Sequence, residues 1–141
     1  MYTRVLLGNL SIERSIIMKR WNYNGGHLDS LARQYLWQVG ADYLHGTGHG
    51  VGFFLNVHEG PNGTGYHKGN PSLEHGMIMS NEPGYYLKDN FGIRIENLIV
   101  AKNYDADNIC FECITLVPYE RELLDHKLLS KDWVDYINAY H

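Results

Sequence analysis

Two histidines in a glycine-rich segment are the first residues of this 141-residue sequence whose types and spacing could do chemistry. His45 and His49 lie four residues apart in the run His-Gly-Thr-Gly-His-Gly-Val-Gly, from position 45 to 52. Zinc-binding helices use this spacing, but each glycine inside a helix costs about 1 kcal/mol, so we predict a loop that enters a strand. The glycines allow close approach of the backbone to a ligand or another chain, and the histidines supply nitrogen donors or acid–base groups near pH 7. Taken alone, both histidines fit a structural role as well as ligation.

Two glutamates shift the interpretation of these histidines from a structural role towards ligation. Glu82 and Glu96 are 14 positions apart, and a turn-like stretch centred on Asp89 lies midway between them. An antiparallel hairpin centred there would place the two carboxylates opposite each other, with Cβ atoms about 4.5–5.5 Å apart. Like charges at that distance are destabilising unless a cation lies between them, so the pattern indicates one metal ion or a pair. For the two glutamates alone, a surface strand with Arg–Glu pairing is the favoured interpretation, and it weakens once His49 is added.

The sequence allows more than one role for the other polar residues near these positions. Arg94 shares a strand face with Glu96, so it could support a ligand or clamp a substrate. His58 ends an apolar run, where a lone histidine is more often structural than chemical. Cys110 and Cys113 have a C-x-x-C spacing, but residues three apart on a strand point to opposite faces, which argues against a shared metal or redox site.

The elements that must position these residues follow from hydrophobic periodicity. Apolar stripes predict helices over about 5–18 and 28–39, and Ser130 is predicted to cap a last helix with a stripe of Trp133, Tyr136, Ile137 and Tyr140. Short β-rich runs between glycine, proline and asparagine predict strands over about 50–58, 77–87, 92–101 and 109–117. The pattern favours helices layered on a sheet, in a mixed α/β or α+β arrangement.

Composition limits the class of protein. The chain has 12 Lys+Arg against 16 Asp+Glu, a net charge of −4, and 44% hydrophobic residues, which favours one soluble globular unit over a disordered or membrane-spanning chain. A mildly acidic chain offers no broad basic face, so nucleic acid is not an expected partner. The opening residues lack the pattern of a secretory signal, and two cysteines are too few for a disulfide framework, so we expect a cytoplasmic location. Five of the eight histidines, His67 among them, lie between residues 45 and 92.

Four motifs match one known family in order and spacing. They are His-Gly-Thr-Gly-His-Gly-Val-Gly at 45–52, Asn-Val-His-Glu-Gly-Pro at 56–61, Asn-Glu-Pro-Gly-Tyr-Tyr at 81–86 and Gly-Ile-Arg-Ile-Glu-Asn at 92–97. The sequence resembles the pita-bread metallopeptidases, specifically the cytosolic aminopeptidase P (Xaa-Pro aminopeptidase) branch. The similarity extends along nearly the whole chain.

The resemblance implies an enzyme that removes an N-terminal residue preceding proline, so its partners would be peptides with proline at the second position. Two metal ions bridged by water or hydroxide would do this, usually Mn²⁺, with Zn²⁺ or Co²⁺ as alternatives. His49, Glu82 and Glu96 would be ligands, and Glu96 would bridge the ions. A carboxylate-rich site suits Mn²⁺, and two ions both generate the nucleophile and polarise the scissile carbonyl.

The resemblance also implies roles for four further residues. His45 and His58 correspond to the family's catalytic histidines, which position the substrate and stabilise the tetrahedral intermediate. Arg94 and Tyr86 correspond to supporting active-site groups.

The family pattern is incomplete in this chain. In the family, two further ligands, both aspartates, and another active-site histidine come from a hairpin before the matched region. The acidic residues before His45 in this chain are Glu13, Asp29 and Asp42, and none lies in a segment that resembles that hairpin. We therefore expect an α+β chain that forms the C-terminal part of a pita-bread fold, with helices packed on a curved, mostly antiparallel sheet. Residues 1–118 would belong to the peptidase domain and 119–141 to the start of a C-terminal helical extension. Three ligands would hold one ion weakly.

In the family, two similar halves pack on one curved sheet. A chain with only part of that sheet would expose an edge and an apolar face, so we expect the isolated chain to oligomerise or aggregate. The stripe of the last helix fits the region where family members extend towards a dimer partner, and we expect a homodimer of the full-length protein.

Two alternatives remain. One is a non-catalytic pita-bread module that binds peptides or proteins, and the other, within the enzyme class, is a dipeptidase for Xaa-Pro. The segments at 45–52 and 56–61 are more similar to the aminopeptidase.

Overall fold

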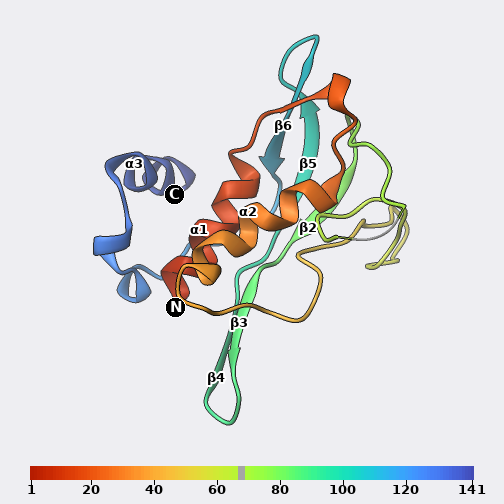
Figure 1. Ribbon diagram of the computed structural model, residues 1–141. Helices are drawn as coiled ribbons and strands as arrows, with labels where there is room; N and C mark the ends of the chain where they lie inside the picture. Colours follow the sequence, from red (N-terminus) through yellow and green to blue (C-terminus); the bar gives the residue numbers. More distant parts are fainter. Residues whose placement is uncertain (67–68) are drawn as a thin grey trace.

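The computed structural model describes residues 1–66 and 69–141 and shows an α+β fold, as predicted (Figure 1). His67, one of the clustered histidines, lies outside the described residues. The helices are α1 (Tyr2–Glu13), α2 (Gly25–Trp37) and α3 (Lys131–Tyr140). The strands are β1 (Ile17–Met18), β2 (Ile78–Asn81), β3 (Gly84–Leu87), β4 (Phe91–Arg94), β5 (Asn97–Asn103) and β6 (Asn108–Cys113). An antiparallel sheet has the order β1-β6-β5-β2, and β3 and β4 form a separate hairpin that projects from it.

The three predicted helices are confirmed with shifted ends. Asn24 caps α2 by accepting a hydrogen bond from the backbone N–H of Gly26, which moves the start of the helix three residues earlier than predicted. Ser130 caps α3, as predicted. The predicted first helix is shorter because Ile17 and Met18 pair with β6 instead. No helix within the described residues is long and apolar enough to cross a membrane.

The predicted strand over 50–58 is wrong. Within this range Gly50 forms an isolated bridge to Met79, and the chain then loops back, with the backbone N–H of Gly52 donating to Asn56 and that of Glu59 donating to Gly50. Phe53 is 101% exposed and its apolar neighbours have no sheet face to cover. Strand-forming residue types do not make a strand without a partner and a face to bury.

The predicted strands over 77–87 and 92–101 are each divided in two. Residues 82–83 and 95–96 separate β2 from β3 and β4 from β5. Pro83 has no backbone N–H, so a continuous ladder cannot pass through it. The predicted strand over 109–117 ends early, at Cys113.

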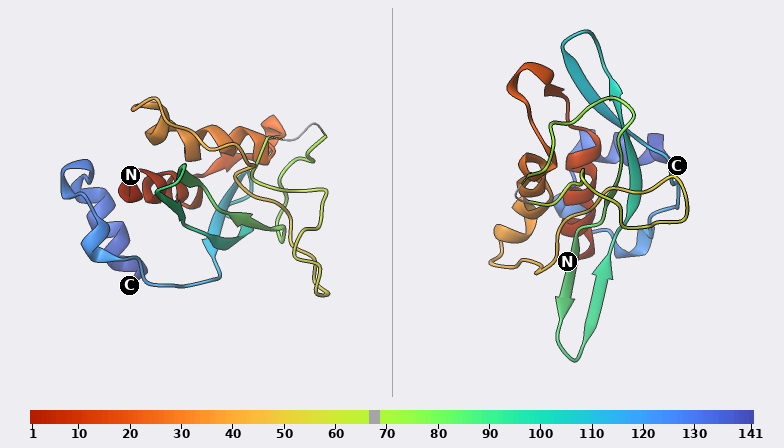
Figure 2. Two further views of the ribbon diagram at one scale, coloured as in Figure 1. Left: turned by 90° about the horizontal axis from the view of Figure 1, so that it is seen from below. Right: turned by 90° about the vertical axis from the view of Figure 1, so that its right-hand side faces the viewer.

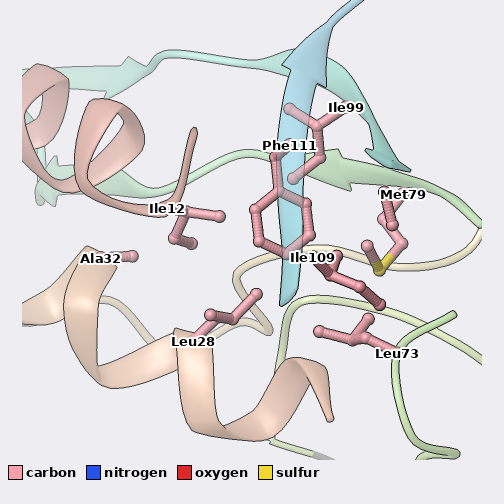
Figure 3. Close-up of a cluster of buried hydrophobic side chains, with 9 residues drawn as sticks. Ile12, Leu28, Ala32, Leu73, Met79, Ile99, Ile109 and Phe111 are labelled. Atoms are coloured by element: carbon pink, nitrogen blue, oxygen red, sulfur yellow. The ribbon is translucent and has the colours of Figure 1, made fainter. Parts of the chain in front are cut away.

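A hydrophobic core lies between α1, α2 and one face of the sheet (Figure 3). Ile12, Leu28 and Ala32 come from the helices, and Met79 and Phe111 come from the strands. Gly8 allows the two helices to pack closely, because a Cβ there would lie 2.1 Å from the carbonyl oxygen of Ala32. The sheet face that the helices cover is therefore filled within this chain.

Helix α3 packs on the opposite side of α1 from the sheet (Figure 2). The guanidinium of Arg14 lies over the rings of Trp133 and Tyr136, at 4.7 and 4.9 Å from their centroids, and Tyr140 stacks on Tyr119 at 4.4 Å. The apolar stripe of α3 therefore packs within the same chain, and the contact of this region with a dimer partner stays a prediction. The division at residue 118 stays a prediction.

Arg33 of α2 fastens the loop that leads into the glycine-rich segment. Its guanidinium donates to both carboxylate oxygens of Asp29, at 2.7 and 3.1 Å, and to a carboxylate oxygen of Asp42 at 2.8 Å. It also donates to the carbonyls of Tyr43 and His45, at 2.7 and 2.8 Å. One side chain thus contacts Asp42, Tyr43 and His45 together.

Replacing Arg33 by Lys should destabilise the protein, because an ammonium group cannot make the forked contacts of a guanidinium. We expect the free energy of unfolding to fall by about 2–4 kcal/mol, since several partly buried acceptors lose a charged donor. Urea unfolding followed by circular dichroism measures this. Arg20→Lys is the control, because Arg20 is exposed. Equal shifts for both variants would contradict the anchoring role.

Glu13 is a buried acid at the end of α1, 7% exposed. Tyr136 of α3 donates to its Oε1 at 2.7 Å, and its Oε2 has no hydrogen-bond partner among the described residues. Burial raises the pKa of Glu13, and the Tyr136 hydrogen bond opposes this only in part.

The raised pKa predicts a pH-dependent loss of stability. Because the folded protein holds this proton more tightly than the unfolded chain, the contribution of Glu13 to stability is fully present below the unfolded pKa of about 4.3 and is lost as pH rises through the folded pKa. Glu13→Gln should remove this part of the slope in urea unfolding measured from pH 4 to 8. The exposed Glu122→Gln should keep it, and an unchanged slope in Glu13→Gln would refute the assignment.

Candidate active site

The register of the strands places Glu82 opposite Glu96, as the hairpin centred on Asp89 predicts. The β3–β4 hairpin pairs Gly84 with Arg94, and β2 and β5 pair Asn81 with Asn97. Both ladders share one register across the break, so the two glutamates face each other where regular pairing stops.

His49 lies beside Glu82 with its Nε2 atom turned towards the carboxylate. Nε2 is 3.2 Å from Oε1 of Glu82, and Nδ1 is 2.8 Å from the carbonyl oxygen of Gly50. The carbonyl can only accept, so Nδ1 carries the proton, and in the neutral ring Nε2 presents a lone pair to the carboxylate. Two acceptors this close repel unless a proton or cation lies between them, and metal-binding histidines commonly have the same Nδ1–H to carbonyl contact.

Glu82 is buried with few compensating contacts. Ser80 donates its hydroxyl to Oε1 at 2.8 Å, and Nη1 of Arg94 lies 3.7 Å from Oε2. The backbone N–H of Glu82 donates to the carbonyl of Thr47 at 2.7 Å, which joins it to the histidine segment. A buried carboxylate with one hydroxyl and a distant guanidinium has capacity for a cation. The donor set of His49 and Glu82 therefore fits a divalent metal ion.

His45, Tyr86 and Arg94 form a hydrogen-bonded chain. Nε of Arg94 donates to the hydroxyl of Tyr86 at 2.9 Å, and that hydroxyl lies 2.9 Å from Nε2 of His45. Nδ1 of His45 lies 2.8 Å from the carbonyl oxygen of Gly46, so Nε2 is the acceptor in the neutral ring. The hydrogen bond from Arg94 to Tyr86 raises the pKa of the guanidinium, with a smaller contribution from Glu82 and Glu96. These hydrogen bonds hold the His45 ring in one tautomer.

His58 reaches the site from the exposed loop after Gly52. Its ring packs edge-on against His49, with centroids 4.2 Å apart. A cavity of about 580 Å³ lies beside both rings. Half of its lining residues are glycines, and Asn62 and Tyr66 also line it. The structure thus brings His58 to His49 although the predicted strand between them does not form.

Glu96 is only partly brought into the site. It faces Glu82 by register, but its side chain is exposed. Within residues 1–66 and 69–141, no group of three or more His, Cys, Asp or Glu side chains lies close enough to hold a metal ion. Two of the three predicted ligands are therefore in contact, and the third lies across the strand break.

The glycines of the segment 45–52 serve close packing of backbone on backbone. A Cβ at Gly48 would lie 2.0 Å from the carbonyl oxygen of Ser80, and one at Gly63 would lie 2.9 Å from that of Gly48. The sequence predicts close approach of these glycines to a ligand or another chain, and the contacts are instead with another part of the same chain.

Sequence reasoning missed Ser80 and Arg33. Ser80 precedes Glu82 by two residues on a strand, so alternation alone puts both side chains on one face. The contacts of Arg33 with residues 42–45 carry no local signal, because they depend on how α2 packs beside that loop.

The comparisons with known proteins agree with this geometry. Residues 1–103 match the model of metallopeptidase family M24, and residues 107–141 match that of the C-terminal region of peptidase M24. Xaa-Pro aminopeptidase 1 of Dictyostelium discoideum is 52% identical over 147 aligned residues, which cover 99% of this chain and 23% of that protein. The chain therefore spans about a quarter of the length of this relative.

Solved structures show the same similarity. The X-prolyl aminopeptidase of Caenorhabditis elegans, described as a cytosolic enzyme with a di-nuclear active site, superposes with a TM-score of 0.93 at 37% identity, over 99% of this chain and 23% of that one. A Xaa-Pro dipeptidase of Bacillus anthracis superposes with a TM-score of 0.67 at 33% identity, over 84% of this chain and 31% of that one. The predicted pita-bread fold is confirmed, and the match over residues 1–103 shows that the chain belongs to metallopeptidase family M24.

Proposed function

We propose that this chain supplies part of the active site of a metal-dependent Xaa-Pro aminopeptidase, which cleaves the bond between an N-terminal residue and proline. The observation that carries the proposal is the contact between Nε2 of His49 and the Glu82 carboxylate, which lie 3.2 Å apart and, with the neutral imidazole, are two acceptors that a cation can bridge. The similarity to proteins named Xaa-Pro aminopeptidase over 99% of the chain supports the same activity.

His49, Glu82 and Glu96 are the proposed metal ligands, with Glu96 bridging two ions. The exposed Glu96 can turn towards Glu82 because it lies opposite in register. A carboxylate-rich donor set favours Mn²⁺, with Zn²⁺ or Co²⁺ as alternatives. When bound, the ions would lower the pKa of water to produce a nucleophile and polarise the scissile carbonyl.

The remaining residues are proposed to handle the substrate. A bond that precedes proline has no amide hydrogen, so recognition depends on donors aimed at carbonyl oxygens and on shape. His45, held by Tyr86 and Arg94, is proposed to stabilise the tetrahedral intermediate. His58, which packs on His49 beside the 580 Å³ cavity, is proposed to position the substrate.

We also propose that the complete protein acts in the cytosol as a homodimer on peptides with proline at the second position. The C. elegans relative is described as cytosolic, which supports the first part. The acidic balance of the chain supports the expectation that nucleic acid is not a partner.

A second candidate is a non-catalytic module that binds peptides or proteins. The observation that favours it is the exposed Glu96 and the lack of a three-residue metal cluster within residues 1–66 and 69–141. Metal-dependent turnover separates the two candidates.

The test is hydrolysis of a Xaa-Pro-Pro tripeptide with added Mn²⁺, followed by release of the N-terminal amino acid. We expect activity from a polypeptide that combines this chain with an upstream hairpin carrying two aspartates, and none from the 141 residues alone. Glu96→Gln in the active form should abolish turnover while circular dichroism stays unchanged. Normal turnover in that variant would remove Glu96 from the site, and no turnover from any folded form would favour the binding module.

Tyr86→Phe should lower kcat by about 100-fold, the scale of a misplaced catalytic group, because His45 loses the hydrogen bond that orients its ring. The same peptide assay measures this in the active form. Tyr85→Phe is the matched control, since Tyr85 packs among core residues and its neighbour on the strand points to the opposite face. Equal losses in the two variants would contradict the proposal that Tyr86 orients the His45 ring.

A further inference from the structure

Asn9 is a fully buried polar residue in the middle of α1. Its side-chain amide donates to the carbonyl oxygen of Asn81 at 2.8 Å and to that of Ile95 at 3.1 Å. In return, the amide of Asn81 donates to the backbone carbonyl of Asn9 at 2.9 Å. The Oδ1 atoms of both asparagines have no hydrogen-bond partner among the described residues. Both amides are thus placed for donation.

The contact with Ile95 replaces a hydrogen bond that the strands cannot make. In an antiparallel ladder, the residues of a hydrogen-bonded pair exchange two N–H···O bonds. The N–H of Ile95 donates to the carbonyl of Pro83 at 3.3 Å, but the return bond is impossible because proline has no N–H. Nδ2 of Asn9 supplies the missing donor to the Ile95 carbonyl.

The same amide controls the two peptide groups that lead into the glutamates. The carbonyl of Asn81 belongs to the peptide group whose nitrogen is that of Glu82, and the carbonyl of Ile95 belongs to the one that leads into Glu96. One NH₂ group therefore bridges both strands immediately before the two carboxylate residues. Rotation or separation of either peptide plane would move the Cα–Cβ bond of the glutamate that follows it.

We propose that Asn9 is a positioning residue that sets the separation and orientation of Glu82 and Glu96 for metal binding. This inference rests on the proposed metal site, in which both glutamates are ligands. Asn9 itself touches neither the ions nor the substrate. It acts through the two backbone carbonyls and replaces the donor that Pro83 lacks.

The test is Mn²⁺ binding by the 141-residue chain, with free Mn²⁺ measured by electron paramagnetic resonance. Asn9→Asp keeps the shape and removes both donors, and Asn9→Leu removes them without adding a buried charge. Loss of a partner that orients metal ligands typically weakens affinity about 10–100-fold, and we expect this for each folded variant. The absorption spectrum of bound Co²⁺ should change as well, because it reports the arrangement of the ligands.

Ile12→Val is the matched control, since Ile12 is equally buried in the same helix but makes no side-chain hydrogen bond to these strands. We expect it to lower thermal stability while it keeps the Mn²⁺ affinity and Co²⁺ spectrum of the parent. An unchanged affinity and spectrum in folded Asn9→Leu would make Asn9 a packing residue and overturn the inference. Glu82→Gln and Glu96→Gln test the underlying site separately. If they leave Mn²⁺ binding unchanged, the proposed metal site fails as well.

Discussion

The structure depends on one interruption in an antiparallel ladder. At Pro83 the strand pair lacks a donor, so regular pairing stops between β2–β5 and β3–β4 while the register continues. Glu82 and Glu96 face each other in this gap. The N–H of Glu82 turns outward to Thr47, which draws the glycine-rich segment and its histidines against the same point. A backbone defect thus becomes the place where His49 meets Glu82, with Glu96 opposite in register.

Two helices hold this arrangement through polar side chains directed at the backbone. Asn9 of α1 reaches the carbonyls beside the ladder break, and Arg33 of α2 reaches those of residues 43 and 45. Helix α3 covers the far side of α1 through Arg14 and Tyr136. The apolar cores supply most of the stabilisation by burial. The donors on Asn9 and Arg33 hold in place the segments that carry Glu82, Glu96 and His45.

Charge at the site is unbalanced in a way that suits a cation. Glu82 is buried beside Nε2 of His49, with Ser80 as a close donor and Arg94 at 3.7 Å. Arg94 is shared with Tyr86, so it cannot compensate the carboxylate completely. A divalent ion would relieve the repulsion between His49 and Glu82. The fold therefore favours metal binding by holding acceptors close together.

The sequence alone determined the local parts of this site. The spacing of Glu82 and Glu96 about Asp89 predicted their register, periodicity and caps predicted three helices, and four motifs identified the family, because each of these depends on residues near in sequence. The predicted strand over 50–58 failed because propensity cannot say whether a partner exists. Tertiary structure alone placed Asn9 against Asn81 and Ile95, and Arg33 against the loop before His49. Most of these contacts join residues far apart in the chain, and they exist only once helices and strands have packed.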